Sequence, residues 1–238
     1  MNSSKTCSYV LGLSVFLGLM GLGYLTGNAA LQVKGMERSV TVKGLSEKEV
    51  MADTVIWPIQ FSAAENDLTK LYTSLERQTA HIIEFLEKNG IAGDAISTSP
   101  PTLTDKSAQN WGNNTNAEFR YTALQNLSVY SNNIESTRKV MSKMSELGKG
   151  GIVLTGGNYQ MQPEYLYTKL NDIKPEMIEE ATKKARLVAE KFADDSQSRL
   201  GKIKQASQGQ FSISARDKNN PHIKKIRVVS TVEYYLSD

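Results

Sequence analysis

The feature that most constrains this chain is its one long apolar run, Val10 to Leu25, which follows a single basic residue, Lys5. None of its 16 residues is charged, and Gly, Leu, Val, Phe and Met make up nearly all of them. A segment of this kind sends the chain that follows it across a membrane. The rest of the chain is polar, so the sequence indicates a compartment and a fold more readily than a reaction.

Two interpretations of this run stay open. A cleaved signal peptide needs small residues at the cut, which Gly27, Ala29 and Ala30 can supply. A retained anchor needs about 20 apolar residues, and residues 8–26 provide 19. Either one places residues 31–238 on the non-cytoplasmic side of the membrane.

A retained anchor would also permit close contacts between helices of neighbouring chains. Small residues allow such contacts in membranes, and the candidate contact residues are Gly12, Gly18, Gly21 and Gly23. Cys7 is the only cysteine, so no disulfide can form within one chain, and it precedes the apolar run.

The residues after position 30 are enough for one large domain or two small interlocked ones. Their charge is uneven, because residues 183–227 hold 12 Lys and Arg against 4 Asp and Glu. Such a segment predicts either a solvated surface or a binding site for nucleic acid or anionic lipid. Aromatic residues do not alternate with these charges as in a single-strand binder, so the solvated surface is the preferred interpretation and no nucleic acid is expected.

Alternating apolar residues predict the strands. Val40 and Val42 mark a short one and residues 55–61 a longer one, in which Pro58 indicates an edge or a bulge because proline cannot donate to a ladder. Further strands are expected at 95–104, 119–130, 157–165, 202–210 and 226–236.

Helical spacing predicts three main helices. The first follows Asn66 or Asp67 and ends at Asn89–Gly90, the second covers 133–147, and the third runs from near Pro175 to about 200. The residues expected to face inward on the third helix are Ile178, Ala181, Ala185, Val188, Ala189 and Phe192. The element order predicts an α+β fold, with antiparallel or mixed sheets packed against three helices behind an N-terminal apolar helix.

Residues 105–117 are polar and rich in asparagine, which predicts an exposed hairpin tip. Trp111 lies within this loop. It is a candidate contact for a partner, and the alternative is that it packs on its own sheet.

The sequence shows no pattern typical of a reaction. The two histidines, His81 and His222, lie on different predicted elements, and His81 is expected to pack half-buried beside the first helix's apolar stripe. There is no nucleophile elbow, no triad order and no phosphate-loop spacing. We therefore predict no catalytic, cofactor-binding or metal-binding residues.

Several segments, taken in order, resemble the SIMPL-domain family, the YggE-like proteins of bacterial envelopes. The matching segments are Val40-Thr41-Val42-Lys43-Gly44, Ala52-Asp53, Ala181…Lys184-Ala185…Ala189, Leu200-Gly201-Lys202-Ile203 and Val228-Val229-Ser230-Thr231-Val232-Glu233-Tyr234-Tyr235-Leu236. The resemblance implies an exported α+β domain over 31–238 behind a signal anchor or signal peptide at 1–30. It also implies assembly into rings or hollow multimers in some relatives and a link to oxidative-stress tolerance. It implies no catalytic residues.

The sequence and the resemblance together predict a non-enzymatic envelope protein that is anchored through residues 8–26, forms a homo-oligomer and acts as a scaffold or binding module. Its expected location is the periplasmic side of the inner membrane, or the periplasm itself if the segment is cleaved. Two alternatives stay open: an uncharacterised periplasmic hydrolase or redox enzyme, and a binder of anionic lipid or nucleic acid through residues 183–227.

Overall fold

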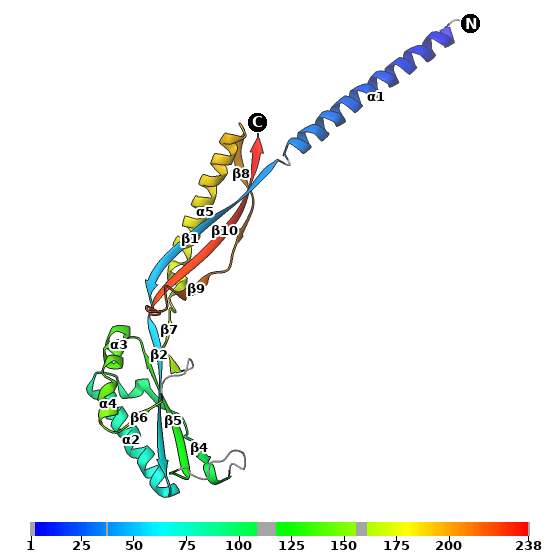
Figure 1. Ribbon diagram of the computed structural model, residues 1–238. Helices are drawn as coiled ribbons and strands as arrows, with labels where there is room; N and C mark the ends of the chain where they lie inside the picture. The colour runs from blue at the N-terminus through cyan, green and yellow to red at the C-terminus, as the bar shows by residue number, and fades with distance from the viewer. Residues whose placement is uncertain (1–2, 37, 109–117, 156–160, 238) are drawn as a thin grey trace. The chain divides into compact units, whose positions relative to one another are not determined.

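The protein is mixed α+β, as the sequence predicted. The computed structural model describes residues 3–36, 38–108, 118–155 and 161–237 (Figure 1). The chain divides into two compact units, which we name after their main helices. The α5 unit comprises Met1–Lys48, Ile173–Ser212 and Ile226–Asp238, and the α2 unit comprises Glu49–Asp172 and Ile213–Lys225.

The N-terminal helix α1 runs from Ser3 to Met36. Its side chains from Gly12 to Ala29 are all exposed. A membrane-spanning helix was predicted over residues 8–26, but none of the helices in the described part of the chain is long and apolar enough to cross a membrane.

The sheet of the α5 unit is built on two long strands, β1 (Ser39–Met51) and β10 (Ile223–Ser237). β10 is central, with β1 on one side and β8 (Arg199–Gln208) antiparallel to it on the other, and β9 (Ser212–Ala215) also pairs with β10. The β8–β10 register shifts on both sides of Tyr234, as at a β-bulge. β8 pairs only with β10 in the described sheet, so it forms an edge.

Helix α5 (Leu170–Asp195) lies along this sheet at very close range (Figure 1). A Cβ atom placed on Gly44 of β1 would come within 1.8 Å of the Ala181 carbonyl oxygen and 2.5 Å of the Ala185 backbone nitrogen. Gly44 therefore serves close packing between strand and helix. Gly44 lies inside β1, so it is not a turn residue.

The buried side of α5 is a row of residues spaced by four, in which one methionine is followed by four alanines. It consists of Met177, Ala181, Ala185, Ala189 and Ala193. The prediction that Val188 and Phe192 face inward was wrong, because they are 39% and 55% exposed. A row spaced by four drifts around a helix of 3.6 residues per turn by about 40° at each step. The buried face has therefore moved away from Val188 and Phe192 by the end of the helix.

The sheet of the α2 unit has the order β3-β5-β2-β6. Its centre is the antiparallel pair of β2 (Thr54–Glu65) and β5 (Tyr121–Ser131), which stay in register from Val55–Ser131 to Glu65–Tyr121. Four short strands complete it: β3 (Ile96–Thr98) and β4 (Thr102–Asp105) pair with β5, and β6 (Val153–Leu154) and β7 (Glu164–Leu166) pair with β2.

Pro58 lies in β2 opposite Ser128 with no register shift, so the sheet has no bulge there. On the other side of β2, β7 pairs with residues 54–56 and β6 with residues 61–62. Within the described residues, Pro58 thus lies on a stretch of β2 with one paired neighbour. A residue without an N–H is tolerated in such a place, although β2 itself lies inside the sheet and not at its edge.

One face of this sheet is covered by α2 (Leu68–Lys88), α3 (Ile134–Ser142) and α4 (Ser145–Lys149) (Figure 1). Of the two predicted caps for α2, the structure selects Asp67, whose side chain accepts a bond from the Lys70 N–H at 2.9 Å. The second predicted helix, at 133–147, is divided into α3 and α4. The third begins at Leu170, so Pro175 lies inside it and not in its first turn.

The core of the α2 unit is large and apolar. Alternate residues of β2 and β5 meet one side of α2, and the fully buried members include Phe61, Leu71, Ile82, Leu86, Leu127 and Val129. The corresponding core of the α5 unit consists of Val42, Ala185, Ala189, Val232 and Tyr234.

Candidate functional site

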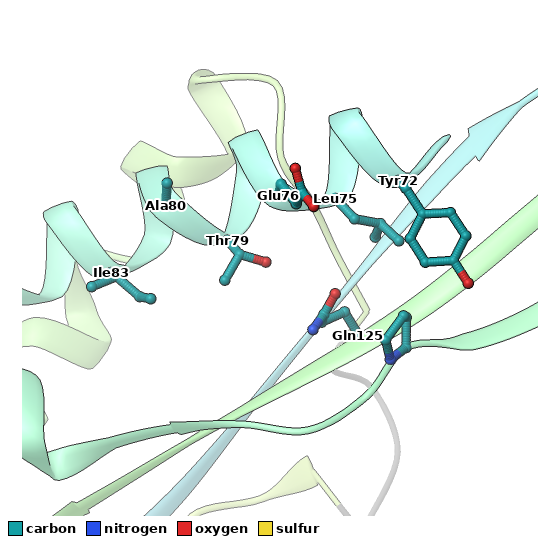
Figure 2. Close-up of a pocket in the computed structure, with 8 residues that line it drawn as sticks. Tyr72, Leu75, Glu76, Thr79, Ala80, Ile83 and Gln125 are labelled. Carbon is teal, nitrogen blue, oxygen red and sulfur yellow. The ribbon is translucent and has the colours of Figure 1, made fainter. Parts of the chain in front are cut away.

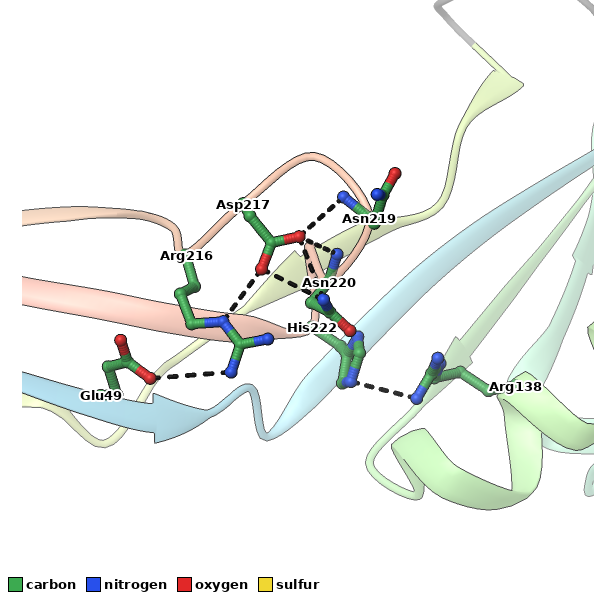
Figure 3. Close-up of polar contacts among 7 residues, drawn as sticks. All are labelled: Glu49, Arg138, Arg216, Asp217, Asn219, Asn220 and His222. Atoms are coloured by element: carbon green, nitrogen blue, oxygen red, sulfur yellow. Dashed lines mark hydrogen bonds and ion pairs between the residues drawn. The ribbon is translucent and has the colours of Figure 1, made fainter.

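A polar cluster surrounds the turn between β9 and β10 (Figure 3). The Asp217 carboxylate accepts hydrogen bonds from the backbone N–H groups of Asn219 and Asn220, at 2.9 and 2.8 Å, and from the Asn220 side chain. Arg216 donates to it from Nε at 2.9 Å and forms an ion pair with Glu49 at 3.7 Å. The Arg216 bond, followed by those from Asn220 and Asn219, lowers the Asp217 pKa to about 2 against the cost of burial.

His222 closes this turn and is 5% exposed. Its Nε2 lies 3.0 Å from Arg138 Nη1 on α3. A guanidinium group can only donate, so Nε2 is the acceptor and the proton of the neutral ring is on Nδ1. Nδ1 is buried and has no partner among the described residues. Burial, and then the charges of Arg138 and Arg216, hold the pKa of His222 below its ordinary value.

The cluster is suited to holding the turn in place. The His222 carbonyl accepts a bond from Ala52 N–H at 2.8 Å, and its ring meets the Tyr165 ring edge-on at 5.9 Å. A neutral imidazole that already accepts from a guanidinium is a poor general base, because its accepting nitrogen is occupied. His222 therefore links α3, the turn and the short segment between β1 and β2.

Asp53, which belongs to the Ala52-Asp53 segment of the family resemblance, fixes the segment that joins β7 to α5. It accepts from the Thr168 N–H at 2.8 Å, the Thr168 hydroxyl at 3.1 Å and the Lys169 N–H at 3.2 Å. Burial raises the pKa of the carboxyl, but the bonds from Thr168, Thr54 and Lys169 together hold it below the ordinary value. A carboxylate is thus fixed by backbone donors, which makes Asp53 a structural residue.

A hollow of about 380 Å³ lies beside α2, between the helix and the segment that joins β3 to β4 (Figure 2). Its lining is mostly apolar and consists of Tyr72, Leu75, Glu76, Thr79, Ala80, Ile83, Pro101 and Gln125. This volume is in the usual range of small-molecule sites, which starts at about 300 Å³. Sequence reasoning missed the hollow because its walls come from three separate segments.

The α5 unit exposes apolar side chains that nothing in the unit covers. Leu187, Val188 and Phe192 do so on α5, and Ile203 does so on the edge strand β8. All but one residue of β8 are exposed, whichever face of the sheet they point to. Exposed apolar groups beside an open strand edge are typical of interaction surfaces.

Several basic residues of the segment 183–227 pair with carboxylates of the same chain. Lys183, Lys184 and Arg186 pair with glutamates one helical turn away on α5, at 2.6 to 3.0 Å. Further along, Lys204 pairs with Glu233 and Arg227 with Glu47. These pairs favour the solvated-surface interpretation over a phosphate-binding stripe.

The other sequence-predicted residues are not brought together. Trp111 lies outside the described residues. A Cβ atom on Gly12, Gly18, Gly21 or Gly23 would meet no atom within 4 Å, so these positions are open for contact. His81 is exposed on α2, and the half-buried packing predicted for it was wrong. Among the described residues no three His, Cys, Asp or Glu side chains are grouped closely enough to hold a metal ion.

Comparison with known families gives one match. Residues 40–233 match the SIMPL family, which is described as a protein of unknown function (DUF541). No curated protein matches the chain significantly. The matched range includes both units, and it begins after α1.

Proposed function

Because this chain belongs to the SIMPL family, we propose that it is a non-enzymatic protein of the bacterial envelope that assembles with copies of itself and acts as a scaffold or binding module. The observation that carries the proposal is the uncovered apolar surface of the α5 unit. Val188 and Phe192, which lie one helical turn apart on α5, are 39% and 55% exposed, a large exposure for neighbouring apolar side chains.

A second copy of the chain is a suitable cover for this surface. The neighbouring charged residues of α5 form pairs within the helix, such as Lys183–Glu179 and Arg186–Glu190, so burying the apolar residues between them leaves few unpaired charges. The open edge of β8 offers backbone hydrogen bonds in addition.

Delivery to the envelope is the second part of the proposal, and it rests on α1. Its exposed side chains include Leu13, Phe16, Leu19 and Leu25, each more than half exposed. Such a helix is unstable in water without a cover. Cell fractionation with mass measurement of the mature N-terminus tests this part, because a cytoplasmic chain with its first residues intact would contradict it.

Light scattering coupled to size-exclusion chromatography of the full-length chain in detergent tests assembly. We expect an oligomer for the natural chain and a smaller species for Phe192→Gln combined with Val188→Gln. The control is Lys191→Gln, which changes the residue next to Phe192 without removing apolar surface. A monomeric natural chain at micromolar concentration would contradict the proposal, as would a double variant that assembles as the control does.

A further inference from the structure

The hollow beside α2 exists because the chain opposite the helix is interrupted. β3 ends at Thr98 and β4 begins at Thr102, and between them Pro100 and Pro101 have no N–H to pair with β5. Pro101 forms part of the wall. On the helix side, α2 directs Leu71, Leu75, Ile82 and Leu86 into the core, so the neighbouring flank of the helix faces the gap.

Gln125 lies in this hollow where the pattern of β5 calls for an apolar residue. Its neighbours on the same face of the strand, Ala123 and Leu127, are buried and apolar, and Gln125 itself is 8% exposed. Within the described residues its side chain makes one hydrogen bond, from Nε2 to the Ser99 carbonyl at 2.9 Å. Figure 2 shows its oxygen pointing toward α2, on the side where the hollow lies. This oxygen is not one of the buried polar atoms without a partner among the described residues, so it reaches the open space of the hollow and can accept from a donor that enters there.

The remaining lining defines which molecules the hollow suits. Tyr72, Leu75 and Ile83 provide an apolar surface. The polar groups of the lining side chains are the Tyr72 and Thr79 hydroxyls, the Glu76 carboxylate and the Gln125 amide, and no Lys or Arg is present in the lining. The only charged side chain in the lining, Glu76, is negative, which suits a neutral or cationic donor and disfavours an anion.

We propose that the hollow between α2 and the Ser99–Pro101 segment binds a small apolar molecule that carries a hydrogen-bond donor and no negative charge, with Gln125 Oε1 accepting from the donor. The inference does not depend on assembly through the α5 unit, because all of the lining residues belong to the α2 unit.

Three probes of equal ring size test it: 2-phenylethanol, 2-phenylethylamine and 3-phenylpropanoate. Each is titrated into the full-length chain in detergent, with the methyl groups of Leu75 and Ile83 observed by NMR. We expect saturable shifts of both residues with the alcohol and the amine, and binding at least about tenfold weaker with the carboxylate. No saturable shift with any probe, or equal binding of all three, would overturn the proposal.

Matched substitutions on one helix locate the binding. Thr79→Phe fills the hollow and is expected to abolish the shifts, whereas Thr73→Phe adds the same ring on α2 outside the lining and is expected to leave them unchanged. Detergent takes up the probes equally in both variants, so only the hollow distinguishes them. Because Thr79→Phe can disturb packing, Glu76→Gln at an exposed position gives a second test. It is expected to reduce the preference for the amine over the carboxylate, and an unchanged preference would refute the role assigned to charge.

Discussion

The two units of this protein bury apolar surface in different ways. The α2 unit packs large side chains, such as Phe61, Leu71 and Leu127, between one helix and one sheet face. The α5 unit brings a row of alanines against a strand at Gly44, and its larger apolar residues Leu187 and Phe192 remain outside. The first unit therefore derives its stability mainly from side-chain burial. The second depends on close backbone contact and leaves large apolar side chains exposed.

The largest effect should come from truncating the core of the α2 unit. Phe61 is fully buried, so Phe61→Ala is expected to lower the free energy of unfolding by about 3–5 kcal/mol. Phe192→Ala removes the same side chain from an exposed position and is expected to change the unfolding of the dissociated chain by less than about 0.5 kcal/mol. Urea denaturation of both variants measures the difference.

Hydrogen exchange in the same variants sharpens this comparison. If the units have separate sources of stability, Phe61→Ala will reduce protection in β2 and β5 more than in α5. Equal loss of protection in both units would show one cooperative structure and would contradict the division.

The next largest effect is expected at the contact between β1 and α5. Gly44→Ala places a Cβ atom against the backbone of Ala181 and Ala185, neither of which can move without shifting the helix. We expect a loss of about 1–3 kcal/mol, measured by urea denaturation. The control is Gly148→Ala on α4, where an added Cβ meets nothing within 4 Å and stability should be unchanged or slightly higher. A harmless Gly44→Ala would refute the close-contact explanation of this unit.

A smaller effect is expected from the hydrogen bond that joins Ser46 of β1 to Glu180 of α5. The Ser46 hydroxyl is fully buried and donates to Glu180 Oε2 at 2.6 Å. Ser46→Ala removes the donor, while Glu180 keeps its ion pair with Lys184 at 2.6 Å, so no charge is left without a partner. The expected loss is about 1 kcal/mol by urea denaturation. A loss as large as that of Gly44→Ala would show that hydrogen bonding, and not close packing, dominates this contact.

The sequence predicted the elements whose apolar pattern is local. α2 follows its spacing from Asp67 onward, and β2, β5 and β10 follow period-two alternation. The inner face of α5 was predicted in part, because a helical stripe does not show how the buried row drifts when small residues are spaced by four. The predictions were least complete where distant segments meet.

The hollow is the clearest example of a feature formed by segments that are distant in the sequence. The sequence shows Pro100 and Pro101 as a break and Gln125 as a polar residue in an alternating strand, but not that the break lies opposite α2. The role of Gly44 was missed for the same reason, since the residues it touches, Ala181 and Ala185, follow more than a hundred positions later.

The smallest predicted effect concerns pH and the turn of the α2 unit. The pKa of Asp217 is lowered to about 2 in the folded chain, mainly by Arg216, from an ordinary value of 3.8. A carboxyl with a lowered folded pKa contributes stability that is fully present above the ordinary value and is lost as the pH falls through the folded one. The contribution should therefore disappear between about pH 4 and pH 2.

Asp217→Asn should unfold at a lower urea midpoint than the natural chain at pH 6. The difference between the two midpoints should narrow as the pH falls from about 4 to about 2. Other carboxyls titrate there too, so only the difference between the two proteins reports Asp217. Asp94→Asn makes the same substitution at an exposed site on the short helix Gly93–Ala95 and is the matched comparison. A constant difference for Asp217→Asn would mean that the turn is held by the backbone of residues 216–222 without help from the charge.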